Sequence, residues 1–182
     1  VVQGVRWEII PGELGSGLTA HVTEPVELAS FRGSDQLSLG AYHLCARTAT
    51  GGVHCSGMGA FGQNGFYEDQ QNAWVVEGLR EITQIETGHS HSCAVLATRA
   101  VRCWGLGEEG QLGVTIGATH VPVGVPDVTE VAEMALGVTH SCARRTDGSV
   151  LCWGRGTFGQ LGSATSPMRS GPVRVSGIST AT

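Results

Sequence analysis

An internal repeat constrains this chain more than any other feature of its sequence. Three stretches follow one pattern: a glycine, a histidine three residues later, a cysteine two residues after that, a second cysteine ten residues on, and a glycine-rich ending. Corresponding residues lie 48 or 49 positions apart. Such a period indicates a fold of stacked supersecondary units. The recurring positions are Gly40, Gly88 and Gly137; His43, His91 and His140; Cys45, Cys93 and Cys142; and Cys55, Cys103 and Cys152.

The local pattern within each copy predicts short β-strands. Residues 101–104 (Val-Arg-Cys-Trp) and 150–153 (Val-Leu-Cys-Trp) are brief apolar segments that a glycine follows at once, which is typical of strands rather than helices. Asp147-Gly148 is a turn signal between a strand through Cys142 and a strand through Cys152. Units of about 48–49 residues with three or four strands each are typical of β-propeller blades. We therefore predict an all-β fold.

The repeat divides residues 1–182 into one repeat domain with three whole copies between two fragments. Glycine, at 28 of 182 residues, is concentrated at recurring turn positions, where positive φ angles or close backbone approach favour it. Segments that begin with Pro-Val mark the expected start of a copy. The predicted units are residues 1–24, the end of a partial repeat; 25–73, repeat 1; 74–121, repeat 2; 122–171, repeat 3; and 172–182, the start of a further repeat.

Charge and hydropathy exclude two classes of partner. All 11 basic residues are arginine, and 16 acidic residues give a net charge of -5. A chain without a basic cluster lacks the positive surface that neutralises phosphates, so we expect no binding to nucleic acid. The sequence has no apolar run of the roughly 18 residues that a spanning helix needs. We therefore expect no membrane insertion.

The cysteine pairs predict disulfide bonds within hairpins. A three-residue loop at 146–148 places Cys142 directly opposite Cys152. Opposed residues of antiparallel strands lie close enough for a disulfide bond. The same spacing applies to the other two pairs, Cys45/Cys55 and Cys93/Cys103. Three disulfides would indicate an oxidising, extracytoplasmic location such as a periplasm, a cell surface or the medium.

Two alternatives for the cysteines stay open at this stage. The histidine two residues before each first cysteine lies on the same strand face, so one histidine and two cysteines could bind zinc. Against zinc, each copy offers three ligands and no Cys-x-x-Cys motif. The cysteines could also be buried, reduced thiols. Disulfides fit the opposed register best, and we expect no metal or cofactor.

No catalytic motif is visible. The chain has no Gly-x-Ser-x-Gly elbow, no phosphate-binding loop and no His-Glu-x-x-His sequence. Ser92 and Ser141 each follow a repeated histidine. Adjacent strand residues point to opposite faces, so neither serine is placed to use that histidine as a base. We expect the chain not to be an enzyme.

The repeats resemble those of the regulator of chromosome condensation family. The pattern Gly-x-x-His-Ser-Cys-Ala, then Gly-x-Val-x-Cys-Trp-Gly-x-Gly-x-x-Gly-Gln-Leu-Gly, stands at 137–162, and the resemblance extends over about 39–175. The paired cysteines are similar to a bacterial-type variant. The resemblance implies a seven-bladed propeller, of which this chain would form about half. It also implies that the repeated glycines and histidines are structural, with the histidines buried and hydrogen-bonded between blades.

The resemblance does not select one function, because family members include exchange factors for a small GTPase and secreted β-lactamase inhibitors. We favour an exported, non-enzymatic protein–protein interaction scaffold that binds an unidentified protein. The unrepeated residues Phe66, Tyr67, Glu68 and Asp69 form the candidate partner-binding loop. A guanine-nucleotide exchange factor and a secreted enzyme inhibitor are the alternatives. Remaining propeller blades or a second copy would have to cover the open blade faces.

Overall fold

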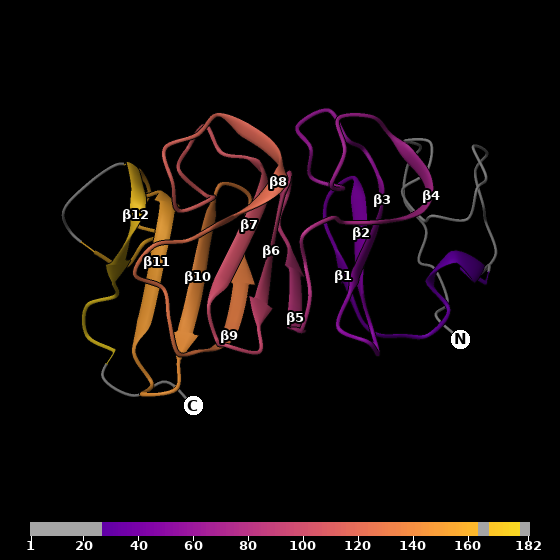
Figure 1. Ribbon diagram of the computed structural model, residues 1–182. Helices are drawn as coiled ribbons and strands as arrows, with labels where there is room; N and C mark the ends of the chain where they lie inside the picture. Colours follow the sequence, from indigo (N-terminus) through magenta and orange to yellow (C-terminus); the bar gives the residue numbers. More distant parts are fainter. Residues whose placement is uncertain (1–26, 164–167, 179–182) are drawn as a thin grey trace.

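The part of the chain that the structure describes forms three four-stranded antiparallel sheets (Figure 1). The structure is a computed structural model and describes residues 27–163 and 168–178. One short 3-10 helix, η1 (Ala29–Phe31), precedes the sheets. The first sheet contains β1 (Ser34–Leu39), β2 (His43–Thr48), β3 (Val53–Gly57) and β4 (Gln70–Val75); the second β5 (Ile82–Thr87), β6 (His91–Leu96), β7 (Val101–Leu106) and β8 (Ala118–Gly124); the third β9 (Val131–Leu136), β10 (His140–Arg145), β11 (Val150–Arg155) and β12 (Met168–Arg174).

Each sheet is a simple meander, in which every strand pairs with the next along the chain. Gly148 has a φ angle of 79° in the turn between β10 and β11, a conformation that costs glycine little. The turn sets the register that the sequence predicts, with Cys142 opposite Cys152 and Arg144 opposite Val150. The all-β prediction is confirmed, and the three sheets have the form of propeller blades. We call them blade 1, blade 2 and blade 3.

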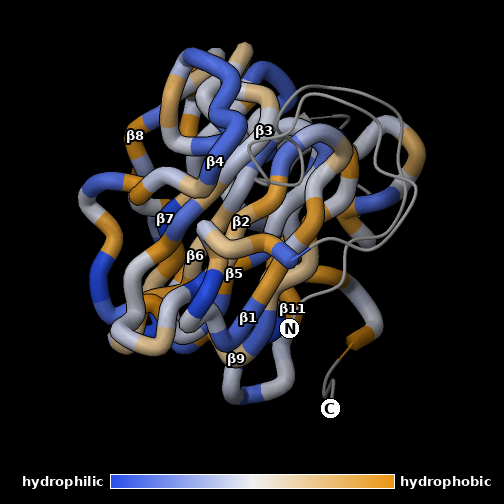
Figure 2. Tube along the Cα trace, turned by 90° about the vertical axis from the view of Figure 1, so that its right-hand side faces the viewer, coloured by the Kyte–Doolittle hydropathy of each residue, from blue (hydrophilic) through white to orange (hydrophobic). Residues whose placement is uncertain are grey.

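The core lies between the blades. One cluster joins Val53, Val76 and Cys55 of blade 1 to Ile85 and Trp104 of blade 2. A second cluster joins blade 2 to blade 3 in the same way, around Trp153. In Figure 2, hydrophobic and hydrophilic segments both occur along the strands. A blade buries its apolar faces by stacking, so each sheet depends on its neighbours for stability.

Inner strands of neighbouring blades are joined by a glutamine side chain. Gln36 of β1 donates its amide to the Ile85 carbonyl at 3.0 Å and accepts the Ile85 amide at 3.0 Å. Gln84 of β5 makes the same pair of contacts with Met134 of β9. These amide contacts fix the position of each inner strand along its axis relative to the next inner strand, so successive blades are held in register.

The sheets divide the chain at different places from the predicted repeats. The Pro-Val segments at 122–123 and 172–173 lie in β8 and β12, which complete the preceding sheets as outer strands. Counted by sheets, the three blades span 34–75, 82–124 and 131–174. The predicted fragment at 1–24 lies outside the described residues. Across the described part of the chain, no helix has the length and apolar character needed to cross a membrane.

Candidate functional site

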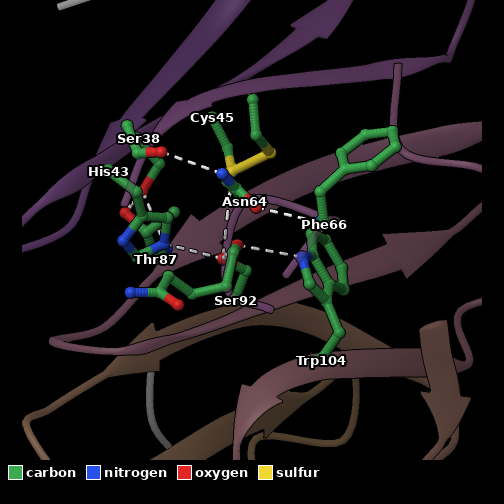
Figure 3. The surroundings of a disulfide bond; sticks show 11 residues. Ser38, His43, Cys45, Asn64, Phe66, Thr87, Ser92 and Trp104 are labelled. Carbon is green, nitrogen blue, oxygen red and sulfur yellow. Dashed lines mark hydrogen bonds between the residues drawn. A yellow bond between two sulfur atoms is a disulfide. The ribbon is translucent and has the colours of Figure 1, made fainter. Parts of the chain in front are cut away.

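A buried polar network joins blade 1 to blade 2 (Figure 3). His43 Nε2 lies 2.8 Å from Ser92 Oγ. Ser92 Oγ donates to the Gln63 carbonyl at 3.0 Å, and Trp104 Nε1 donates to the same carbonyl at 3.0 Å. A carbonyl oxygen has two lone pairs and can accept both donors. One blade therefore supplies a histidine and a carbonyl, and the next supplies a serine and a tryptophan.

The same network recurs between blades 2 and 3. His91 Nε2 lies 2.9 Å from Ser141 Oγ. Ser141 Oγ and Trp153 Nε1 both donate to the Gln111 carbonyl, each at 2.9 Å. We call this arrangement the His–Ser–Trp socket: the preceding blade forms the socket with its histidine and glutamine carbonyl, and the following blade inserts the serine and tryptophan.

The hydrogen bonds of the socket determine which ring nitrogen of its histidine carries the proton. Because the Ser92 hydroxyl proton goes to the Gln63 carbonyl, His43 Nε2 must carry the proton that Ser92 Oγ accepts. The buried Nδ1 atoms of His43 and His91 have no hydrogen-bond partner. Burial, reinforced by neighbouring histidines, lowers the pKa of both side chains to about 3. Both histidines are therefore neutral at physiological pH and serve as hydrogen-bond donors.

The repeated glycine makes room for this histidine. A Cβ atom on Gly88 would overlap the His91 ring and lie 2.6 Å from the Gly137 carbonyl of the next blade. Gly40 has the same surroundings, formed by His43 and the Gly88 carbonyl. The Gly-x-x-His spacing thus lets the imidazole fold back over its own backbone at the point where two blades touch.

Sequence reasoning missed the partner of Ser92. It placed the serine on the opposite strand face from its own histidine, and the structure does the same. The serine instead contacts the histidine of the preceding blade. The signal was present in the sequence. Adjacent residues of a strand point to opposite faces of its sheet, so in a stack of blades the histidine and the serine face different neighbouring blades. This contact leaves both groups occupied in packing, so the network is a structural connection.

Loss of the serine hydroxyl should weaken the blade 1–blade 2 contact. We expect Ser92→Ala to lower the free energy of unfolding by about 1–3 kcal/mol, because the buried His43 Nε2–H loses its acceptor. The urea-unfolding midpoint measures this change, and Ser176→Ala, at an exposed position, is the control. Equal midpoints for the two variants would contradict the role assigned to the network.

Each cysteine is bonded to the partner that the register predicts. The disulfides are Cys45–Cys55, Cys93–Cys103 and Cys142–Cys152. In this form each sulfur is bonded to sulfur, so no thiolate is present to bind zinc as the alternative requires. Among the described residues, no group of three or more His, Cys, Asp or Glu side chains has an arrangement suited to a metal ion.

The candidate loop at 66–69 is held by buried Asn64. The Asn64 amide donates to the carbonyls of Gly57 and Glu68, both at 2.8 Å. Its side-chain oxygen accepts the Phe66 backbone N–H at 2.8 Å. Leu112 and Leu161 occupy this position in the other copies. Sequence reasoning did not single out Asn64, although its departure from the repeat was a readable signal.

The four loop residues have different surroundings. Asp69 accepts the Gly59 backbone N–H at 2.9 Å, and the Phe66 ring meets Trp74 edge-on at 5.8 Å. Both side chains therefore support the loop. Tyr67 is 55% exposed and Glu68 is also exposed. Of the predicted loop, Tyr67, Glu68 and Asp69 are exposed, and Asp69 also holds the loop through its contact with Gly59.

A second aromatic residue lies on the same end of the blades. The β1–β2 and β3–β4 connections leave the same end of blade 1, and the Met58 amide donates to the Tyr42 carbonyl at 2.8 Å. Tyr42 meets His89 of blade 2 edge-on at 5.5 Å, and Tyr67 meets His120 of blade 2 at 4.6 Å. We call this surface, Tyr42, Tyr67, Glu68, His89 and His120, the aromatic face.

A groove lies at the opposite end of the inner strands, with a volume of about 630 Å³. Its charged side chains are paired within their own blades. Arg47 lies 2.8 Å from Asp35, and Arg144 lies 3.0 Å from Glu133. Each of these four charges is therefore balanced by a partner on its own blade.

Stacked four-stranded sheets joined by a repeating socket define a repeat β-propeller protein, of which this chain forms part of a ring. Two models of the regulator of chromosome condensation (RCC1) repeat match it, one over 35–63, 82–111 and 131–160, the other over 101–144 and 147–181. The chain therefore belongs to the RCC1 repeat family. A comparison with curated protein sequences found no match.

Solved structures show the same fold. Human WBSCR16 is 24% identical with a TM-score of 0.77, and the match covers 93% of this chain and 49% of that one. Yeast RCC1 (Prp20), bound to Kap60, is 21% identical with a TM-score of 0.75, covering 90% and 42%. Saccharomyces cerevisiae Prp20p, whose structure was described with its binding properties to Gsp1p and histones, is 19% identical with a TM-score of 0.75, covering 90% and 44%. This chain spans just under half the length of these proteins.

Proposed function

We propose that the chain is an exported, non-enzymatic protein-binding scaffold whose aromatic face contacts a partner protein. The observation that carries this proposal is the pair of unrepeated, partly exposed tyrosines, Tyr42 and Tyr67, on one end of a repeated scaffold. The glycines, histidines and cysteines of the repeat recur in every copy, whereas these tyrosines do not. Ser90 and Thr139 replace Tyr42 in the other copies, and Thr115 replaces Tyr67 in the second.

The chemistry of the aromatic face favours a basic protein partner. Tyrosine is enriched at protein interfaces because its ring supplies a large contact area and its hydroxyl can donate a hydrogen bond. Glu68 beside Tyr67 and Glu108 in the neighbouring loop are both exposed and negative. An acidic rim around aromatic anchors attracts a positively charged partner and excludes acidic ones. Binding of histones by Prp20p is consistent with such a preference within the family.

Export is supported by the three disulfides. Such bonds persist in oxidising compartments and are rare where glutathione and thioredoxin keep thiols reduced. The family's exchange-factor activity is the alternative, and catalysed release of GDP from a small GTPase by this chain would favour it. Selective inhibition of one secreted hydrolase would instead identify the partner as an enzyme.

A photo-cross-linking experiment tests the aromatic face. A benzophenone amino acid is placed at Tyr67 and, as the control, at Thr98, which is exposed in the β6–β7 turn at the opposite end of the blades. We expect one discrete, salt-sensitive adduct with a basic protein from the source organism at position 67 and none at position 98. Glu68→Arg should abolish the adduct. Equal cross-linking at both positions would contradict the proposal.

A further inference from the structure

The connection between β7 and β8 of blade 2 forms a small surface pocket. Its volume is about 240 Å³, and all of its walls come from residues 107–117. The walls combine glycine backbone with two apolar side chains, and the polar side chains are a threonine and Glu108. Blade 2 packs against a neighbouring blade on each side, so the pocket belongs to a part of the fold whose packing is complete.

The pocket is present where the equivalent connection of blade 1 carries a side chain. In blade 1, the Asp69 carboxylate accepts the Gly59 backbone N–H at 2.9 Å. Gly117 stands at this position in blade 2, and its backbone carbonyl accepts the Gly107 N–H at 2.6 Å instead. A Cβ atom on Gly117 would meet no atom within 4 Å. The absence of a side chain at Gly117 therefore leaves space in the connection.

A second difference concerns a backbone carbonyl at the wall of the pocket. In blade 1, the Asn64 amide donates to the Glu68 carbonyl at 2.8 Å. Leu112 and Ile116 occupy these two positions in blade 2, and leucine has no donor to offer. A Cβ atom on Gly107 would overlap the Ile116 carbonyl, so this oxygen lies close to the pocket-lining backbone. The Ile116 carbonyl lacks the side-chain donor that serves its counterpart in blade 1.

The charge of the pocket comes from one carboxylate. Glu108 is exposed and has no ion pair among the described residues, whereas the neighbouring Glu109 lies 3.5 Å from Arg155. No basic side chain lines the pocket. A carboxylate at an apolar wall attracts a cation carried on an aliphatic stem and repels acidic groups.

The size and the acceptors of the pocket suit lysine. A volume of about 240 Å³ equals that of about eight water molecules at roughly 30 Å³ each, which is sufficient for a lysine side chain. An ammonium group offers three donors that can reach a carboxylate and a carbonyl in different directions. A guanidinium group is planar and is best matched by a carboxylate that it can contact with two parallel hydrogen bonds. The pocket therefore favours lysine over arginine.

The pocket borders the aromatic face. The β3–β4 and β7–β8 connections lie at the same end of their blades (Figure 1). His120 follows Gly117 by three residues, and its ring meets Tyr67 of blade 1 at 4.6 Å. A protein that covers Tyr67 is thus placed to insert a side chain into the pocket.

We propose that the pocket is a subsite for one lysine side chain of the basic partner. The aliphatic stem packs against Val114 and Ile116, and the ammonium group binds the Glu108 carboxylate and the Ile116 carbonyl. This assignment rests on the proposed function, because the lysine belongs to the protein that contacts the aromatic face.

A titration of the full chain followed by NMR tests the subsite without the partner. The probe is N-acetyl-lysine methylamide, and the readout is the backbone amide signals of Gly107, Gly110 and Gly117. We expect these signals to shift in a saturable manner. N-acetyl-norleucine methylamide has an aliphatic stem without the ammonium group and should bind at least about threefold more weakly. Tighter binding of N-acetyl-arginine methylamide than of the lysine probe would overturn the proposal.

Two adjacent glutamates provide a matched pair of variants. Glu108→Gln should weaken binding of the lysine probe about threefold to fivefold, the effect of one exposed ion pair. Glu109→Gln removes the same charge one residue away and should leave the affinity unchanged. Gly117→Leu should abolish the saturable shifts, and unchanged indole N–H signals of Trp104 and Trp153 would show that both sockets are still formed. Equal weakening by the two glutamate variants would overturn the proposal, because only the general acidity of the surface would then attract the probe. The glutamate comparison decides the question even if Gly117→Leu does not fold, because neither glutamate lies in the core.

Cross-linking at position 67 separates this inference from the proposed function. We expect Glu108→Gln to lower the yield of the adduct with the basic partner about threefold to fivefold, as it lowers binding of the lysine probe, and Glu109→Gln to leave the yield unchanged. An adduct that forms equally well in both variants would overturn the lysine subsite while the proposed function stands. Binding of the lysine probe in the pocket without any adduct at position 67 would overturn the proposed function, and with it the assignment of the lysine to that partner.

Discussion

Reduction of the three disulfide bonds is expected to unfold most of the chain at 25 °C. Each disulfide closes a loop with a sequence separation of 10 residues, and the chain-entropy model assigns about 2.5–3 kcal/mol to a loop of this size. Three such contributions sum to about 8 kcal/mol, which is comparable to the whole stability of an ordinary domain. The measurement is the urea-unfolding midpoint with and without a phosphine reductant.

A variant that lacks one of the three disulfides measures the contribution of a single bond. Cys93→Ala with Cys103→Ala removes the disulfide of blade 2, which has a blade on both sides, and should lower the free energy of unfolding by about 3 kcal/mol. The disulfide-bonded chain in the presence of the phosphine oxide, which does not reduce disulfides, is the control for direct effects of the reagent. An unchanged midpoint after six thiols have been titrated in the reduced chain would contradict the assigned contribution.

Acidification is expected to destabilise the chain well above the pH range in which carboxylates titrate. The pKa values of His43 and His91 fall from the ordinary value of 6.5 to about 3 in the folded chain, first because of burial and then because of neighbouring histidines. The unfolded chain therefore binds more protons below pH 6.5, and stability decreases as the pH falls from 6.5 towards 3. At pH 5 each histidine should lower the free energy of unfolding by about 2 kcal/mol.

Two variants separate the effect of the buried histidines from the general sensitivity of the chain to acid. His91→Gln keeps an N–H donor for Ser141 without a titratable ring, so its stability should depend less steeply on pH between pH 6.5 and 5. Ser176→Ala, at an exposed position, should leave the slope unchanged. Hydrogen bonds from Ser149 hold the pKa of Asp147 below its ordinary value, so this carboxylate titrates at lower pH. Equal slopes for both variants would contradict the assignment.

The sequence was informative wherever one copy of the repeat contains the whole interaction. Cys142 and Cys152 pair across one turn, so the register of a single hairpin places them face to face. The strands, their order and the blade architecture follow from the same short-range pattern. Such features depend on neighbouring residues along the chain, and a period read from the sequence is sufficient to predict them.

Sequence reasoning was weaker where a residue acts across two blades. Ser92 was paired with no partner, although it bonds to His43 of another sheet. Of the four predicted loop residues, Phe66 and Asp69 support the loop itself, and buried Asn64 holds it. The repeat pattern marks these positions but does not identify their partners, because exposure and pairing depend on how separate sheets are stacked.

The sequence by itself determined the unit of this protein: a blade of three or four short strands with a cross-strand cysteine pair, repeated three times. Local hydrogen bonding and alternation of side chains are sufficient for that. Only the tertiary structure decided how the units join, because the His–Ser–Trp socket brings together residues about one repeat apart on different sheets. The same stacking brings Tyr67 of blade 1 against His120 of blade 2, and a period along the chain does not show which unrepeated residues share one surface.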